Sequence, residues 1–190
     1  MGLLINRSQK WAFIHIPKTG GNSISQILLN QPGTEQITVH GPINQLRDVE
    51  GYFIFSFVRN PYTRFASWFE HRKREDKAYL FSDFIKSIDP LDFLFFSQDY
   101  YLNHGKTNEK KMSFVGRYEN FNEDLNYILN HIGVEQKEIP HLNRNKYWEK
   151  FPNLDTWSLY KTYYREPWMK EWVKEKYKND FTIFHYDLDI

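Results

Sequence analysis

The sequence predicts an α/β fold in which a parallel sheet is flanked by helices. The prediction rests on three separate segments, each of which joins a short apolar run to a stretch with helical spacing. The chain has 190 residues, which suits one domain with a sizeable core and leaves too little for a second full domain. We therefore expect residues 1–190 to form a single domain.

The first of these segments begins with "WAFIHI", residues 11–16, which alternates and is rich in aromatic and β-branched residues. That pattern predicts a strand. Residues 17–21 break it, and Ile24, Ile27 and Leu28 then follow at helical spacing. The sequence therefore predicts a strand, a tight turn and a helix in succession.

The second segment begins with a nearly continuous apolar run, residues 52–58, which is typical of a strand buried on both faces. A helix is expected directly afterwards. Asn60 can cap its N-terminus, and Pro61 suits the first helical position, where the missing N–H costs nothing.

The third segment predicts a strand within residues 112–118, followed by a helix that ends at Gly133. Its apolar stripe consists of Leu125, Ile128, Leu129 and Ile132. Between the second and third segments, residues 80–110 are irregular and rich in aromatic residues, and we interpret them as a helical insertion covering the sheet edge. Near the end of the chain, Pro167 is expected to start another helix.

Composition limits the classes of function. Lys and Arg number 25 against 24 Asp and Glu, so no global charge would hold the chain on nucleic acid or an anionic membrane. There is no cysteine, which excludes disulfides, thiolate metal sites and cysteine nucleophiles. No apolar stretch approaches the length of a membrane span. We expect a cytoplasmic protein, and its oligomeric state is left open.

The turn "PKTGGNS" after the first predicted strand has the features of an anion-binding loop. Gly20 and Gly21 allow backbone N–H groups to approach an anion closely, and the helix that follows adds the positive end of its dipole. Lys18 supplies a mobile full charge. Three further side chains can donate hydrogen bonds: Thr19, Asn22 and Ser23.

This turn does not match the nucleotide-binding P-loop pattern. Pro17 stands directly before Lys18, and Ala12 stands where the first glycine of that pattern should be. The second strand ends in Arg59, where a nucleotide hydrolase would need a carboxylate to hold Mg²⁺. We therefore expect a second phosphate to be bound directly by this cation, with no metal.

Arg59 and Ser67 form the second predicted anion-binding group. Ser67 lies eight positions after Arg59, about two helical turns along. A guanidinium can contact a phosphate through two parallel hydrogen bonds, which suits arginine to this role better than lysine. Two separate groups of this kind indicate a ligand with phosphate at both ends.

Both motifs resemble those of a known family. "HIPKTGGNS" is similar to the 5′-phosphosulfate-binding loop, and "FVRNPYTRFAS" to the 3′-phosphate-binding motif, of sulfotransferases that use 3′-phosphoadenosine-5′-phosphosulfate (PAPS). The chain resembles in particular the branch that contains the heparan sulfate 2-O- and 6-O-sulfotransferases and small bacterial relatives. Weaker similarity continues through "GRYENFNEDL", "HLNRN" and "KYKNDFTIFHY".

The resemblance implies a fold like that of the P-loop NTPases and transfer of a sulfuryl group from PAPS to a hydroxyl of a glycan or small-molecule acceptor. Adenosine 3′,5′-bisphosphate (3′,5′-ADP) would be the product, and no metal would be required. Residues 18–23 would bind the 5′ phosphosulfate, and Arg59 with Ser67 would bind the 3′ phosphate. Lys18 would stabilise the charge that grows on the leaving phosphate.

The acceptor hydroxyl also needs a base, and histidine is the side chain whose ordinary pKa suits neutral pH. Of seven histidines we choose His40, because it lies between the two phosphate motifs, where 6-O-sulfotransferase-like members carry their base. His104 is the alternative base, and His15 is expected to order the loop. Two other functions stay open: a nucleotide-dependent phosphotransferase, and a non-catalytic module that binds 3′,5′-ADP.

Overall fold

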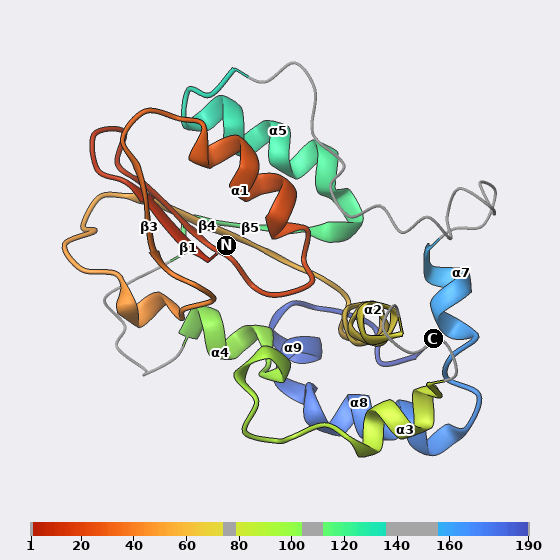
Figure 1. Ribbon diagram of the computed structural model, residues 1–190. Helices are drawn as coiled ribbons and strands as arrows, with labels where there is room; N and C mark the ends of the chain where they lie inside the picture. The colour runs from red at the N-terminus through yellow and green to blue at the C-terminus, as the bar shows by residue number, and fades with distance from the viewer. Residues whose placement is uncertain (1, 74–78, 104–111, 136–155, 190) are drawn as a thin grey trace. The chain divides into compact units, whose positions relative to one another are not determined.

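The computed structural model describes residues 2–73, 79–103, 112–135 and 156–189. The chain divides into two compact units (Figure 1). The sheet unit comprises Met1–Arg59 and Gln98–Leu142, and the helical unit comprises Asn60–Ser97 and Asn143–Ile190. Each unit is described by itself, and one domain over residues 1–190 stays a prediction.

Within the described residues the sheet unit contains one five-stranded sheet with the order β3-β1-β2-β4-β5. Strand β4 runs parallel to both β2 and β5, whereas β1 is antiparallel to both β2 and β3. The strands are β1 (Leu3–Asn6), β2 (Trp11–Ile14), β3 (Thr34–Thr38), β4 (Phe53–Val58) and β5 (Phe114–Arg117).

The expectation of a parallel sheet was therefore only partly right, because the sheet is mixed. β1 and β2 are joined by residues 7–10, a connection long enough for a hairpin but far too short for the crossover that parallel neighbours need. Neither β1 nor β3 was predicted. β1 is only four residues long, and β3 is a polar edge strand with Glu35, Gln36 and Ile37 exposed.

The three predicted strands and the helices after them are confirmed. β2 leads to α1 (Gly21–Leu29), β4 to α2 (Pro61–Arg72) and β5 to α5 (Phe121–His131). Helices α1 and α5 lie over the same face of the sheet in Figure 1. Their apolar stripes pack on strand residues in a core that includes Phe13, Phe55, Phe57, Ile24, Leu28, Leu125, Ile128 and Leu129.

The helical unit is built around aromatic side chains. Its described helices include α2, α3 (Phe81–Lys86), α7 (Thr156–Lys161), α8 (Pro167–Lys176) and α9 (Lys178–Ile183). Asn60 caps α2 as predicted, its side-chain oxygen accepting a hydrogen bond from the Tyr62 backbone N–H at 2.9 Å. α8 begins at Pro167, also as predicted. The core includes Tyr62, Phe65, Phe69, Phe81, Phe84, Tyr164 and Tyr177.

The predicted insertion at residues 80–110 contributes to both units. Its first part forms α3 in the helical unit, and its last described part forms α4 (Gln98–Asn103) in the sheet unit. Residues 104–110 lie outside the described part of the chain. The segment is therefore partly helical, as expected, and covering of the sheet edge stays a prediction.

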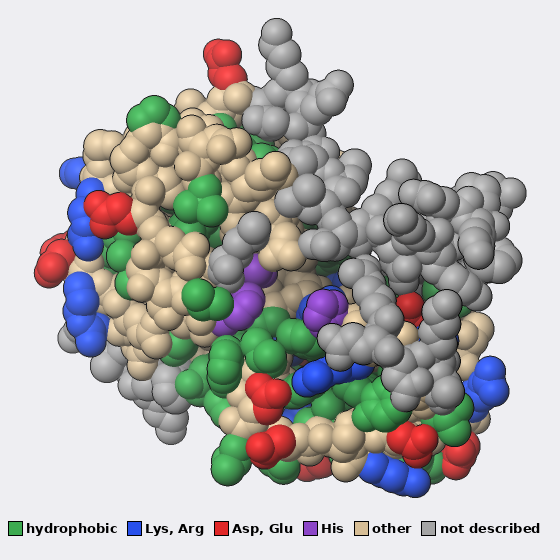
Figure 2. Space-filling view, in the orientation of Figure 1, with side chains coloured by type: hydrophobic (Ala, Val, Ile, Leu, Met, Phe, Trp, Pro, Cys, Tyr) green, Lys and Arg blue, Asp and Glu red, His purple; other side chains and the backbone are tan. Residues whose placement is uncertain are grey.

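The surface carries charges of both signs. Over the sheet unit in Figure 2, Lys and Arg side chains are interspersed with Asp and Glu side chains, in keeping with the near-neutral composition. Where the structure describes the chain, no helix combines the length and the apolar character that crossing a membrane requires.

Replacing Ile128 tests the packing of α5 on the sheet. Ile128 is fully buried in the sheet-unit core, so we expect Ile128→Ala to lower the free energy of unfolding by about 2–5 kcal/mol. Asn126→Ala, an exposed change on the same helix, should alter it by at most about 0.5 kcal/mol. Urea denaturation measures both, and equal effects of the two changes would show that α5 is packed differently.

Candidate anion-binding site

The predicted anion-binding turn and Arg59 follow two neighbouring parallel strands. β2 pairs with β4 in a register that sets Ile14 opposite Ser56, so the residues that come next on both strands emerge at the same edge of the sheet. Open α/β sheets place their ligands at this edge. Nη1 of Arg59 donates a hydrogen bond to the backbone oxygen of Lys18 at 3.3 Å. The structure thus brings together the two motifs that the sequence separates by about forty residues.

The turn itself uses left-handed backbone conformations. Lys18 has φ 70° and Gly20 has φ 87°, and the first value is uncommon for a residue with a side chain. Such strained residues gather at functional sites. Thr19 is fully buried, and its hydroxyl donates to the Ile16 backbone oxygen at 2.8 Å. The Thr19 side chain therefore stabilises the turn, a role that sequence reasoning had not given it.

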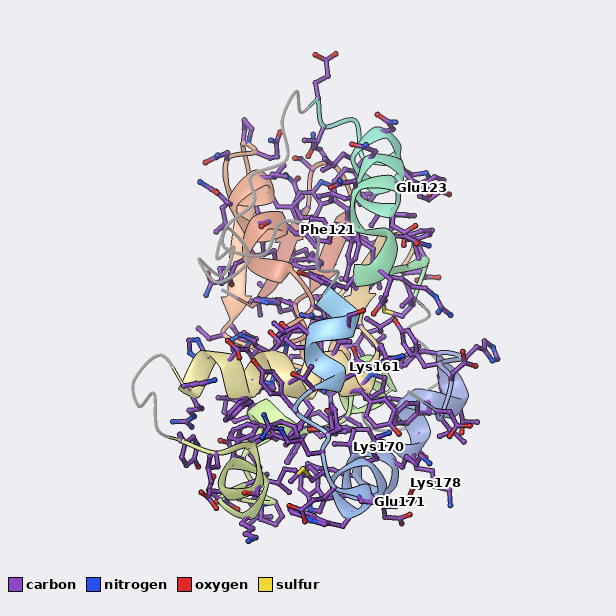
Figure 3. All side chains as sticks on the ribbon, turned by 90° about the vertical axis from the view of Figure 1, so that its right-hand side faces the viewer. Phe121, Glu123, Lys161, Lys170, Glu171 and Lys178 are labelled. Atoms are coloured by element: carbon purple, nitrogen blue, oxygen red, sulfur yellow. The ribbon has the colours of Figure 1, made fainter. Side chains whose placement is uncertain are left out.

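Neighbouring aromatic rings leave no space for a side chain at either glycine of the turn. A Cβ atom at position 20 would lie 2.6 Å from Cε2 of Phe121, and one at position 21 would overlap the ring of His15. Phe121 lies at the start of α5, where Figure 3 labels it. From the sequence, both glycines were expected to allow close approach of an anion. The structure adds that aromatic rings pack against the backbone of the turn.

The N-terminus of α1 completes the turn. Gly20 is its N-cap, a residue with no side chain that could form a capping hydrogen bond. Asn22 is exposed, whereas Ser23 is buried and its backbone N–H donates to the oxygen of Gly20 at 3.1 Å. The positive end of a helix dipole therefore lies directly beside Lys18, an arrangement that favours a bound anion.

Arg59 is held by two residues that sequence reasoning did not connect with it. Its backbone N–H donates to Oε1 of Gln98, and Nε2 of Gln98 donates back to the Arg59 oxygen, both at 2.8 Å. Its guanidinium lies over the Tyr118 ring, 4.0 Å from the centroid. Arg59 is only 3% exposed, so a ligand would reach a small part of it. No local pattern links positions 59, 98 and 118.

His40 lies just after β3, and its ring centroid is 4.8 Å from that of His15. His15 is 3% exposed and stacks on Phe13. Burial lowers the pKa of His40, although a hydrogen bond with the backbone of His15 acts in the opposite direction. Among the described residues, the buried Nδ1 of His40 finds no hydrogen-bond partner. The predicted base therefore packs against the same histidine that packs against Gly21.

The described structure does not test two of the candidate residues. Ser67 lies on α2 in the helical unit and is partly buried, and its predicted role beside Arg59 stays a prediction. His104 lies outside the described residues. Among the residues that are described, no group of three or more His, Asp or Glu side chains could hold a metal ion.

Comparison with known proteins gives one informative match. A family model described as the sulfotransferase family matches residues 1–187. A protein of Archaeoglobus fulgidus, described only as uncharacterized, is 33% identical over 90 residues, which cover 46% of this chain and 73% of that protein. No solved structure matches the chain.

A double-mutant cycle tests the packing of His15 against the turn. Gly21→Ala should lower the free energy of unfolding by about 1–3 kcal/mol, because the new methyl group would overlap the His15 ring. In a His15→Ala background the same change should cost clearly less, since the ring is gone. Urea denaturation of the four proteins measures the coupling. An equal cost in both backgrounds would contradict this packing.

Proposed function

The chain belongs to the sulfotransferase family, and we propose that it transfers a sulfuryl group from PAPS to a hydroxyl of a glycan or small-molecule acceptor by in-line attack. The observation that carries the proposal is the hydrogen bond between Arg59 and the backbone of Lys18. It joins two cationic residues from distant motifs at one edge of the sheet. A donor with phosphate groups at both its 3′ and 5′ positions needs two cationic side chains, one for each position.

The residues present fit this donor. Lys18, the bare backbone at Gly20 and the uncapped start of α1 suit the 5′ phosphosulfate, and Arg59 suits the 3′ phosphate. We further propose that Ser67 contacts the 3′ phosphate and that Asn22 and Ser23 donate to the 5′ group. The sequence of strand, turn and helix beside the parallel strand β4 supports a P-loop-like fold.

Two side chains perform the chemistry in this proposal. Bound PAPS supplies the sulfuryl group. His40 accepts the proton of the acceptor hydroxyl, and its lowered pKa keeps it neutral and ready to accept at pH 7. The Lys18 ammonium stabilises the negative charge that develops on the 5′ phosphate, an electrostatic contribution of the kind that is often the largest in catalysis.

Nucleotide binding tests the donor assignment. In a thermal-shift assay, 3′,5′-ADP without Mg²⁺ should stabilise the wild type by about 2.7 kcal/mol at a hundred times its dissociation constant. Compared with its own ligand-free form, Arg59→Ala should lose most of the stabilisation by 3′,5′-ADP. It should keep the stabilisation that 5′-AMP gives the wild type. A larger shift with ATP–Mg²⁺ would favour the phosphotransferase, and no shift with any nucleotide would refute the proposal.

The pH dependence of turnover tests His40. Protonated His40 cannot accept a proton, so kcat/KM should fall toward low pH with an apparent pKa below the ordinary 6.5. His40→Ala should lower kcat by about 10² to 10⁴. The measurement is formation of 3′,5′-ADP from PAPS with a panel of sugar and phenol acceptors.

His131→Ala is the matched control. His131 is another histidine that packs against an aromatic ring, that of Phe53, and it lies at the end of α5 and has no role in the proposed chemistry. It should leave the pH profile unchanged. An unchanged profile in His40→Ala would assign the base to another residue, with His104 the first to examine. Binding of 3′,5′-ADP without any transfer would indicate the non-catalytic module.

A further inference from the structure

We propose that Tyr118 is a positioning residue for Arg59 and thereby sets the preference of this protein for nucleotides with a 3′ phosphate. The proposal rests on the proposed function, because it assigns the 3′ phosphate to Arg59. It adds a residue to which no phosphate-binding motif points. Tyr118 lies 59 positions after Arg59, immediately beyond β5.

Two described contacts orient the guanidinium of Arg59. Its central carbon lies over the Tyr118 ring, 4.0 Å from the ring centroid. Its Nη1 donates in the other contact to the Lys18 oxygen at 3.3 Å. The ring therefore restricts the plane of the guanidinium, and the hydrogen bond restricts rotation within that plane. Such orientation matters because two parallel hydrogen bonds to a phosphate require a defined plane.

The Tyr118 ring is supported by the sheet and the turn. It packs against Phe121 with ring centroids 5.9 Å apart, and Phe121 in turn packs on Phe57 of β4 at 5.2 Å. The ring of Phe121 also lies against Gly20 in the anion-binding turn. The residue that orients Arg59 is thus fixed to the same elements that carry both anion-binding groups.

The backbone of Arg59 has a separate support. Gln98 is fully buried and forms hydrogen bonds with both the N–H and the oxygen of Arg59. A change at Tyr118 should therefore disturb the Arg59 side chain while the backbone stays in place. The contact uses the face of the Tyr118 ring, so phenylalanine should replace tyrosine and an aliphatic residue should not.

The test is the ratio of dissociation constants for 5′-AMP and 3′,5′-ADP, measured by calorimetric titration. Tyr118→Leu should raise the dissociation constant of 3′,5′-ADP about 3- to 30-fold and leave that of 5′-AMP nearly unchanged. Tyr118→Met is a second aliphatic variant with the same expectation. Tyr118→Phe should restore the wild-type ratio. In an Arg59→Ala background, Tyr118→Leu should have no further effect on the ratio.

Tyr127→Leu is the matched control, because Tyr127 is a tyrosine of the same unit whose ring packs against other rings, those of Phe114 and His131. It should keep the wild-type ratio. If the wild type prefers 3′,5′-ADP and Arg59→Ala abolishes that preference while both aliphatic variants at Tyr118 retain it, the inference alone is overturned. The inference is also overturned if these variants weaken the binding of 3′,5′-ADP and of 5′-AMP equally. A wild type without any preference refutes the proposed function and the inference together.

Discussion

The parallel pairing of β2 with β4 is the constraint on which the candidate site depends. It sets Ile14 opposite Ser56, and the Ser56 hydroxyl donates to the Ile14 oxygen at 2.7 Å in the buried sheet. A shift of one residue would displace Arg59 by about 3.3 Å along the strand and reverse which side chains face the core. The buried aromatic residues on β2 and β4 oppose such a shift, and so they hold the two cationic groups at one edge.

Around this pair, the turn is shaped by aromatic rings as well as by its own glycines. Phe121 lies against Gly20, and His15 lies against Gly21 and beside His40. A single packed cluster therefore connects the anion-binding turn, the proposed base and the support of Arg59. Burial of His40 in this cluster lowers its pKa, which links the packing of the sheet unit to the proposed chemistry.

Local sequence patterns predicted the elements whose formation depends mainly on neighbouring residues. Apolar runs located β2, β4 and β5, and Asn60 with Pro61 located the start of α2, because strands and caps depend on neighbouring residues. The edge strand β3 was missed because its side chains are mostly polar and exposed. The supports of Arg59 were missed for another reason: Gln98 and Tyr118 reach it only through the folded sheet unit, and no periodicity records such contacts. Ser67 belongs to the helical unit, so its predicted role beside Arg59 stays a prediction.

The proposed function requires the Lys18 turn and Arg59 to bind opposite ends of one nucleotide. Phosphorus-31 NMR of 3′,5′-ADP at saturation tests it most directly, because the 3′ and 5′ phosphates give separate resonances. We expect Lys18→Ala to reduce the binding-induced shift of the 5′ resonance and to leave the 3′ resonance as in the wild type, and we expect Arg59→Ala to do the reverse. Perturbation of the same resonance by both substitutions would contradict the claim.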